Sequence, residues 1–346
     1  LILSISTGVN AYISSIEKET LSEYPLSIQS TGIDMSAMMG EPVKKNNSEV
    51  KVVDMMENMF SKIGSNDLKN LKAYIEDHKE INQYARAVEY DYGISPQIYT
   101  NDKYGIRQVN PDATMKKLGM GTSSNSMMSS MMNTNVFYSL PSHSSLYNDQ
   151  YDVKAGHWPK NKNECVLVLS KKGGISDFML YTLGLRDPAQ LDQMLEAFSE
   201  EKSVKVTTSK QGYRYKDLLG ITFKVVNATS YYQYDDTYKV YKDKSNDTNY
   251  INSLVQNGND LKIVGVVQPK ESTNASMLSM GIYYPNELVT STIQEAGNSD
   301  IVKAQLENKN INVITGQSFN DQSQKSFDLS SMFQVDNNAL KNAFQF

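Results

Sequence analysis

Two short apolar runs constrain the fold of this chain more than any other part of its sequence. Residues 165–169, Cys-Val-Leu-Val-Leu, follow a Gly-His-Trp-Pro turn and a polar spacer. Residues 261–267 form a second run, which is rich in β-branched residues and ends in a Gln-Pro-Lys loop. Short apolar runs bounded by turn residues are typical of β-strands. The middle of the chain is therefore predicted to be rich in β structure.

Helical and strand patterns are interspersed along the rest of the chain. Helices are predicted over 49–63, 67–79, 176–183, 188–200, 286–296 and 299–308. Strands are predicted over 26–32, 81–92, 97–109, 136–140, 281–284 and 311–315. The polar stretch 242–260 is predicted to be a loop. Helices and strands mixed in this way predict an α+β fold.

Residues 1–24 carry the pattern of one amphipathic helix. Pro25 ends this helix because proline lacks the backbone N–H that a further turn needs. A long, one-sided helix is expected of a stalk that rises from a membrane, and the alternative is an ordinary N-terminal core helix. The sequence contains no apolar run of 18 residues, so no membrane-spanning helix is predicted within it. The apolar stripe of the helix consists of Ile2, Ile5, Val9, Ile13, Ile16 and Leu21.

The charge distribution argues against a nucleic-acid-binding protein, and the cysteine content excludes a disulfide-stabilised one. The net charge of −5 is made of interspersed acidic and basic residues. Nucleic-acid binding needs a clustered basic face, so no nucleic-acid partner is predicted. Cys165 is the only cysteine, which excludes an internal disulfide. Within its strand it is expected to behave as a small buried apolar residue.

No pattern for catalysis, a cofactor or a metal ion is found. The Gly-Met-Gly stretch at 119–121 and the Lys-Lys-Gly-Gly stretch at 171–174 both lack the spacing of a phosphate-binding loop. His78, His143 and His157 do not have the spacing of metal ligands. The chain is therefore predicted not to be an enzyme and to hold no metal or cofactor.

Two groups of side chains are candidates for contact with a cargo or a partner. Methionine is a soft copper(I) ligand and also forms adaptable apolar surfaces, and a loosely ordered loop is a third interpretation. Tyrosines in strands stack on ligands or fill one face of a sheet. The first group lies in a Ser-, Gly- and Met-rich loop at 111–133 and consists of Met127, Met128, Met131 and Met132. The second lies in a tyrosine-rich block at 231–241 and consists of Tyr231, Tyr232 and Tyr234.

The turn formed by Gly156, His157, Trp158 and Pro159 is interpreted as a structural motif, with Trp158 packing the turn onto the β-rich part of the chain. This turn, the strand after it and the later run at 261–267 resemble the extracytoplasmic domain of MacB-like and FtsX-like ABC transporter permeases. In that family a Gly-Arg turn with an apolar strand, and a later Val-Ile-Gly-Val-Val strand, bracket a small β domain. Here His157 takes the place of the arginine.

Other segments follow the order of the same family, in its large Gram-positive form. The Gly-Ile-Tyr-Tyr-Pro-Asn-Glu-Leu stretch at 281–288 and the segment 299–319 are similar to its returning strand and helices. The methionine-rich loop and the long segment 171–260 exceed the compact family pattern. The resemblance implies an N-terminal stalk helix at 1–25, a porter-like α+β subdomain at 26–140 plus 281–320, an inserted β-rich subdomain at 141–280, and a linker with the start of a helix at 321–346.

The resemblance also implies a function. The chain would lie on the extracellular face of the cell membrane and couple ATP-driven motion of membrane helices to the export or release of peptide, drug or lipid-linked cargo. Its partners would be an ATP-binding subunit or domain, a second permease copy, an adaptor protein, and the membrane itself through transmembrane helices outside this sequence. The alternatives are a peptide-binding or sensing module of a permease, and a surface adhesin or structural domain.

Overall fold

The computed structural model describes residues 26–33, 63–112, 135–200, 202, 212–273 and 275–320. Within these residues it has the predicted α+β fold, in two compact units. The predicted stalk helix, the four candidate methionines and the predicted terminal helix lie outside the described residues. Unit 1 comprises Leu1–Asp91, His143–Tyr151 and Pro269–Ser279, and unit 2 comprises Tyr92–Ser142, Asp152–Gln268 and Met280–Phe346.

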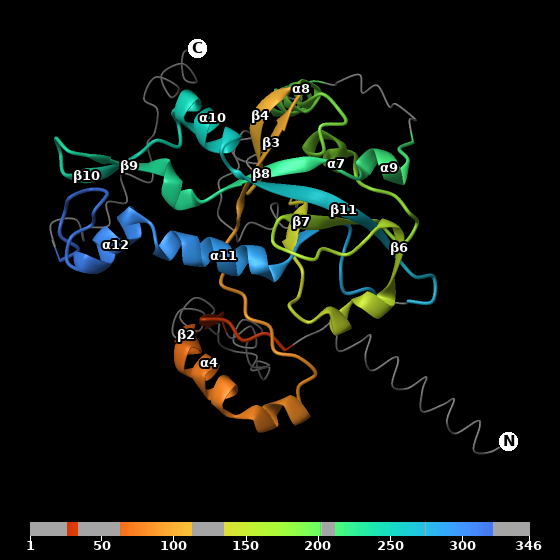
Figure 1. Cartoon of the computed structure of the whole chain (residues 1–346), viewed down its shortest axis with the longest axis horizontal. Helices are drawn as coiled ribbons and strands as arrows, with labels where there is room; N and C mark the ends of the chain where they lie inside the picture. Colours follow the sequence, from red (N-terminus) through yellow and green to blue (C-terminus); the bar gives the residue numbers. More distant parts are fainter. Residues whose placement is uncertain are drawn as a thin grey trace, which may run out of the picture. The chain divides into compact units, whose positions relative to one another are not determined.

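Unit 2 is built on one curled, mixed sheet (Figure 1). Seven strands follow one another in the order β4-β3-β8-β11-β7-β12-β5, and β6 also pairs with β11. The pairs β11–β7 and β12–β5 are parallel, and the other pairs along the row are antiparallel. The bounds are β3 Gln97–Asp102, β4 Gly105–Asn110, β5 Phe137–Ser139, β6 Tyr151–Gly156, β7 Glu164–Val168, β8 Thr222–Val226, β11 Asn259–Pro269 and β12 Gly281–Tyr284.

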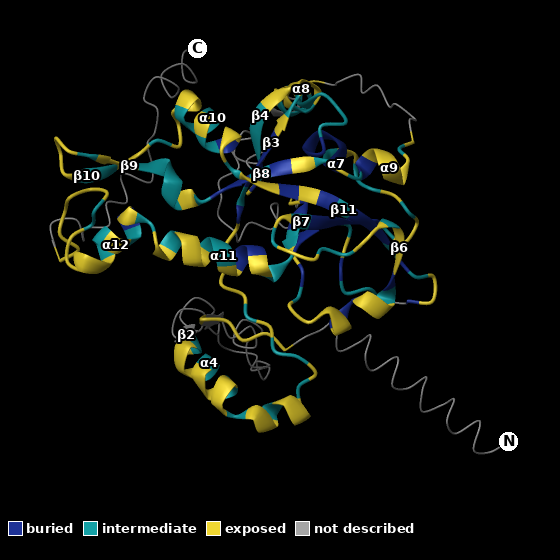
Figure 2. Cartoon of the chain, viewed as in Figure 1, coloured by how far each residue is buried: buried dark blue, intermediate teal, exposed yellow. Residues whose placement is uncertain are grey.

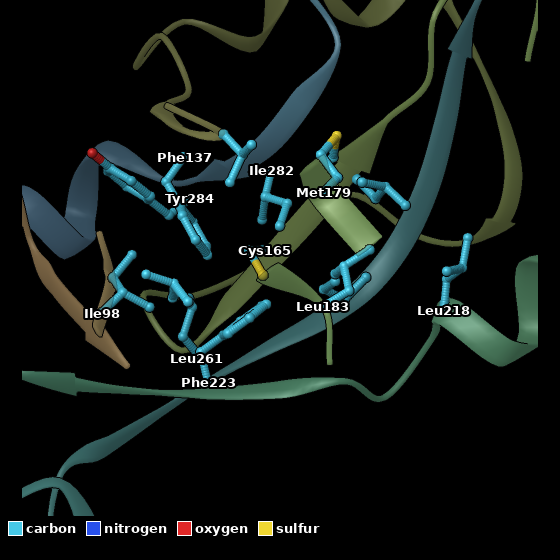
Figure 3. Close-up of a cluster of buried hydrophobic side chains, with 14 of the residues drawn as sticks. Ile98, Phe137, Cys165, Met179, Leu183, Leu218, Phe223, Leu261, Ile282 and Tyr284 are labelled. Carbon is cyan, nitrogen blue, oxygen red and sulfur yellow. The ribbon is translucent and has the colours of Figure 1, made fainter. Parts of the chain in front are cut away.

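The two apolar runs that dominate the sequence are the adjacent strands β7 and β11. Cys165, Val166, Leu167 and Val168 are completely buried, because β7 is covered on both faces. A strand covered on both faces needs a continuous apolar run rather than alternation. Figure 3 shows Cys165 inside a cluster of buried side chains that includes Phe137, Phe223 and Tyr284 from other strands of the sheet. Cys165 is therefore a buried core residue, as predicted.

The helices of unit 2 largely follow the sequence prediction. The Ser176 hydroxyl accepts a hydrogen bond from the Met179 N–H at the start of α7 (3.3 Å), and Gly184 follows this helix with a φ of +68°. Leu288 and Val289 of α11 are buried in the same core as β7. The bounds are α7 Asp177–Thr182, α8 Pro188–Ser199, α9 Tyr215–Leu218, α10 Thr248–Gln256, α11 Asn286–Gly297 and α12 Asp300–Glu307.

The predicted loop at 242–260 is wrong in part, because it contains helix α10. The Asp247 carboxylate accepts a hydrogen bond from the Tyr250 N–H (3.1 Å) and so caps the first turn. Val255 is completely buried in a small cluster with Tyr99 and Val226, and the half-buried Ile251 packs against that cluster. The helix thus depends on an apolar spacing of four residues that the surrounding polar residues obscure in the sequence.

Two predicted strands are also wrong. The segment 81–92 begins within the 3-10 helix η1 (Lys79–Gln83) and contains no strand. Its side chains bond elsewhere in unit 1: Arg86 donates to the Ser145 carbonyl (2.6 Å), and Glu89 accepts from His143 Nδ1 (2.7 Å). The segment 311–315 forms a single β-bridge and a turn, in which the Asn312 side chain accepts from the Ile314 N–H (2.9 Å).

The strands of the two predicted subdomains share the sheet of unit 2. β3, β4 and β5 fall within the predicted 26–140 part and β12 within the 281–320 part, yet they pair with β7, β8 and one another. The positions 140 and 281 are therefore not boundaries between sheets.

Unit 1 combines segments from three parts of the chain. β1 (Thr31–Ile33) pairs antiparallel with β2 (Ile63–Ser65), and α4 (Leu68–Asp77) begins at an Asp67 cap, as the sequence predicts. No residue of α4 is buried, which makes this helix largely yellow in Figure 2. The 3-10 turns η2 (Ser144–Leu146) and η3 (Asn148–Gln150) lead to buried Tyr151, whose hydroxyl donates to the Leu278 carbonyl (2.7 Å).

Candidate functional site

The Gly156 turn meets strand β11 backbone to backbone. Gly156 has a φ of +72°, and a Cβ at this position would collide with the Val264 carbonyl oxygen. A Cβ at Gly265 would collide with the His157 carbonyl oxygen. Each of these two glycines therefore lies against the residue next to the other glycine, and neither position has room for a side chain.

The same junction lies at an irregularity in β11. The register of β11 against β7 shifts between Ile263 and Gly265, which places an extra residue, Val264, in β11. The His157 N–H donates to the Val264 carbonyl (3.0 Å) and ties the turn to this bulge. The two sequence stretches that carry the family resemblance are thus joined in space. This junction is structural: His157 is exposed, and its Nδ1 lies 2.8 Å from the Trp158 carbonyl oxygen.

The three candidate tyrosines occupy two different environments. Tyr231 lies at the end of η4 (Ala228–Tyr231), packs against the cluster around Val255, and places its hydroxyl 2.7 Å from that of Tyr99. Burial raises the pKa of the Tyr231 phenol above its ordinary value. Tyr232 and Tyr234 instead lie on a two-stranded hairpin. Tyr231 therefore serves packing, and the other two remain candidates for contact.

The hairpin consists of β9 (Tyr232–Asp235) and β10 (Val240–Asp243). Residues directly opposite each other in an antiparallel pair share one face, so Tyr232, Tyr234 and Tyr241 lie together. The ring centroids of Tyr234 and Tyr241 are 5.1 Å apart, with their planes at 60°. We call these three residues the tyrosine face. Tyr234 is 47% exposed, and the other two are half-buried.

Asp235 and Lys242 fix the shape of the hairpin from its opposite face. Asp235 accepts hydrogen bonds from the N–H groups of Thr237 (2.8 Å) and Tyr238 (3.1 Å) and pairs with Lys242. Lys242 and these N–H groups hold the pKa of Asp235 below its ordinary value. The Lys242 ammonium also lies 4.5 Å from the centre of the Tyr238 ring. Lys239 closes the loop with a φ of +56°.

A segment near the end of the described chain continues the surface of the hairpin. The Tyr241 N–H donates to the Val313 carbonyl (2.8 Å), and Val240 lies against Gly316. Burial, the Asp300 carboxylate, the Tyr234 phenol and the Glu307 carboxylate together raise the pKa of Tyr241. The Val313 N–H also donates to the side chain of Gln305 on α12 (3.2 Å), so the tyrosine face lies near α12. Large apolar side chains are also exposed on α12 and on the segment after it, at Leu306, Ile311, Ile314 and Phe319.

A small polar cleft lies between α11 and the loop before β7. Lys162 Nζ is 2.6 Å from Ser291 Oγ and 3.1 Å from the Glu295 carboxylate, which Ser291 also contacts at 3.0 Å. The cleft has a volume of ≈ 10 Å³, about the space that one water molecule needs. A serine between an ammonium and a carboxylate in so small a space clamps α11 to the loop, and the cleft has no room for a substrate.

The structure thus separates Tyr231, which packs against the cluster around Val255, from Tyr232 and Tyr234, which lie on the hairpin. Sequence reasoning missed Tyr241 of the tyrosine face, and it also missed Asp300 and Glu307 of α12. The signal for Tyr241 was its place in the tyrosine-rich block, but its pairing with Tyr234 depends on the hairpin register. No sequence signal links α12 to the hairpin. In the described residues, no group of three or more histidine, cysteine, aspartate or glutamate side chains is placed to hold a metal ion.

No helix in the described part of the chain is long and apolar enough to cross a membrane. Comparisons with protein-family models, with curated proteins and with solved structures found no match for this chain.

Proposed function

We propose that this chain is the extracytoplasmic domain of a MacB-like or FtsX-like ABC transporter permease, and that it couples ATP-driven motion of membrane helices to the movement or release of cargo. The observation that carries this proposal is the junction at Gly156 and Gly265. The two motifs of the family resemblance come together there, although about 100 residues separate them in the sequence.

The junction suits a part that transmits force. Backbone lies directly on backbone there. In the neighbouring strands, Cys165 to Val168 of β7 and Val266 and Val267 of β11 are completely buried. Close-packed interiors compress little and pass strain on to their neighbours. In this proposal the sheet of unit 2 moves as one body, a porter-like α+β part and a β-rich insertion share it, and the helix at 1–25 connects it to the membrane.

In this proposal, other parts of the transporter supply ATP hydrolysis and complete the assembly. ATP hydrolysis takes place on a separate ATP-binding subunit or domain, and a second permease copy and an adaptor complete the transporter. The cargo is a peptide, a drug or a lipid-linked molecule on the extracellular face. This chain itself catalyses no reaction.

The test is a stiffness change in the predicted stalk of the full transporter. Glycine in a helix interior is about 1 kcal/mol per site less favourable than alanine, so replacing Ser14 and Ser15 by glycine creates a hinge that the alanine pair does not. Transport per ATP hydrolysed, measured in proteoliposomes, is expected to fall while the outer domain stays folded. Replacement of both serines by alanine is the matched control and is expected to leave coupling intact. Unchanged coupling in the glycine variant would contradict the proposal.

A second function, a peptide-binding or sensing module, is favoured by the tyrosine face. Paired, partly exposed tyrosines beside exposed apolar residues are typical of surfaces that contact partners. The two functions are compatible, because a domain that moves can also carry a binding surface.

A further inference from the structure

Tyr234 and Tyr241 form an open aromatic corner on the hairpin. Their ring planes meet at 60° with centroids 5.1 Å apart, and nearly half of the Tyr234 surface is exposed. The face of an aromatic ring carries partial negative charge and attracts cations within about 6 Å of its centre. Tyr238 on the same hairpin already has the Lys242 ammonium over its ring. The Tyr234–Tyr241 corner thus offers the same kind of site on the other face.

Two carboxylates of α12 lie near this corner, in addition to Asp243, which is opposite Tyr232 on the hairpin. Asp300 and Glu307 are the first and last residues of α12, seven positions apart, and so lie on one side of the helix about 10 Å from each other. Hydrogen bonds link this helix to the hairpin, because Val313 accepts from the Tyr241 N–H (2.8 Å) and donates its own N–H to the side chain of Gln305 on α12 (3.2 Å). Among the basic residues of these elements, Lys303 lies on almost the same side of α12, and Asp235 holds Lys242 on the opposite face of the hairpin.

We infer that the tyrosine face, with Asp300 and Glu307, binds an extended basic peptide segment whose lysine or arginine side chains lie about three residues apart. One cation packs on the Tyr234–Tyr241 corner beside one carboxylate, and the next reaches the other carboxylate. The inference rests on the second proposed function, a peptide-binding surface, and does not depend on transport.

The spacing of the carboxylates favours a peptide over a single ammonium compound. An extended chain advances about 3.3–3.6 Å per residue, so three residues span the roughly 10 Å between Asp300 and Glu307. A single quaternary ammonium would reach one carboxylate and leave the other without a counter-charge. The two carboxylates also disfavour an anionic membrane surface as the occupant.

The test is an NMR titration of the whole chain, with its tyrosine rings labelled, using the end-blocked peptide Lys-Ala-Ala-Lys. Ring signals of Tyr234 and Tyr241 are expected to shift. Tyr234→Leu is expected to weaken binding about two- to fivefold, and Tyr234→Phe, which keeps the ring face, by less. Tyr238→Leu is the matched control, because Lys242 already occupies that ring, and it is expected to leave binding unchanged.

Charge variants test the other half of the site. Asp300→Asn and Glu307→Gln are each expected to weaken binding about two- to fivefold at low salt, with a smaller effect at high salt. Lys303→Gln is expected to tighten it. The inference is overturned if Gln-Ala-Ala-Gln or tetramethylammonium binds as tightly, or if Tyr234→Leu has no effect. The coupling assay with the Ser14 and Ser15 variants tests the transport proposal separately. The transport proposal and the peptide-binding inference can therefore be contradicted independently of each other.

Discussion

Glycine positions show how strongly single residues constrain this fold. Gly93, Gly156 and Gly265 lie in unit 2. A side chain at these positions would be destabilising for up to two reasons, a left-handed backbone conformation and collision with neighbouring atoms. Gly93 has a positive φ of +64° with open space around it, Gly265 has a close backbone neighbour without a positive φ, and Gly156 has both. The three positions therefore separate backbone strain from steric collision.

Alanine at Gly156 is expected to destabilise the protein more than alanine at Gly93 or Gly265. Gly93→Ala should cost about 1–2 kcal/mol through left-handed strain alone, and Gly265→Ala about 1–3 kcal/mol through collision with the His157 carbonyl. Gly156→Ala, which adds both, should cost about 2–5 kcal/mol. Urea unfolding of the three variants measures this. A Gly156 variant as stable as the Gly93 variant would show that the junction yields easily.

The second prediction at the residue scale concerns Cys165. Burial, and then the nearby Glu164 carboxylate, raises the pKa of its thiol well above the ordinary value of 9.0. The folded state therefore keeps the thiol proton at a pH where the unfolded state loses it. Stability from this group is complete below the unfolded pKa and falls as the pH rises, by about 1.4 kcal/mol per unit.

Urea unfolding between about pH 9 and pH 10 tests this sign. Cys165→Ala removes the titrating group, so its stability should fall less steeply over that interval than that of the unsubstituted chain. Equal slopes for the two proteins would mean that the thiol ionises equally well in the folded and unfolded states.

At the scale of the element, α10 shows how a polar segment becomes a helix. Its sequence carries few apolar residues, but Asp247 caps its start and Val255 is completely buried. The hairpin β9–β10 is similar, because Asp235 closes its loop with two side-chain hydrogen bonds. Local polar caps and one or two buried anchors specify both elements.

Removal of the α10 cap is expected to cost about 1 kcal/mol, the usual effect of an N-cap substitution. Asp247→Ala leaves the Tyr250 N–H without its protein acceptor, whereas Asp247→Ser keeps a capping oxygen and is the control. Thermal unfolding of both variants checks the difference. If the serine variant loses as much stability as the alanine variant, the carboxylate stabilises the helix by another route, such as its contact with Lys244.

At the scale of the whole molecule, the sheet of unit 2 ties distant segments into one cooperative structure. β3 pairs with β8 on one of its edges, and β5 pairs with β12. Residues 26–140 alone contain β3, β4 and β5 but none of the buried central strands β7, β8 and β11. Most of the core that would cover them is therefore missing from that part.

The fragment 26–140 is accordingly expected to show no cooperative thermal transition by circular dichroism. The fragment 92–320, which contains every strand of the larger sheet, is the control and should unfold cooperatively. A cooperative transition in the shorter fragment would mean that the β3–β4 hairpin and its neighbours carry enough core of their own.

Much of the fold was predictable where local physics is strong. The apolar runs at β7 and β11, the capped helices α4 and α7, and the strand β12 all appear where the sequence predicted them. The failures at 81–92 and 311–315 share a cause. Their apolar residues suggested strands, but side-chain hydrogen bonds of Arg86, Glu89 and Asn312 take the place of a ladder. The tyrosine face was predictable only in part, because Tyr241 joins Tyr234 through hairpin register.

The sequence by itself determined the α+β class, the buried character of Cys165 and most helix ends, because burial on both strand faces and N-capping act over a few neighbouring residues. Only the tertiary structure decided which strands share a sheet, that Gly156 lies against Val264, and that Asp300 and Glu307 lie near the tyrosine face. These relations join residues far apart in the chain. Their energies come from close packing and from charges across space, and neither leaves a periodic signal in the order of residues.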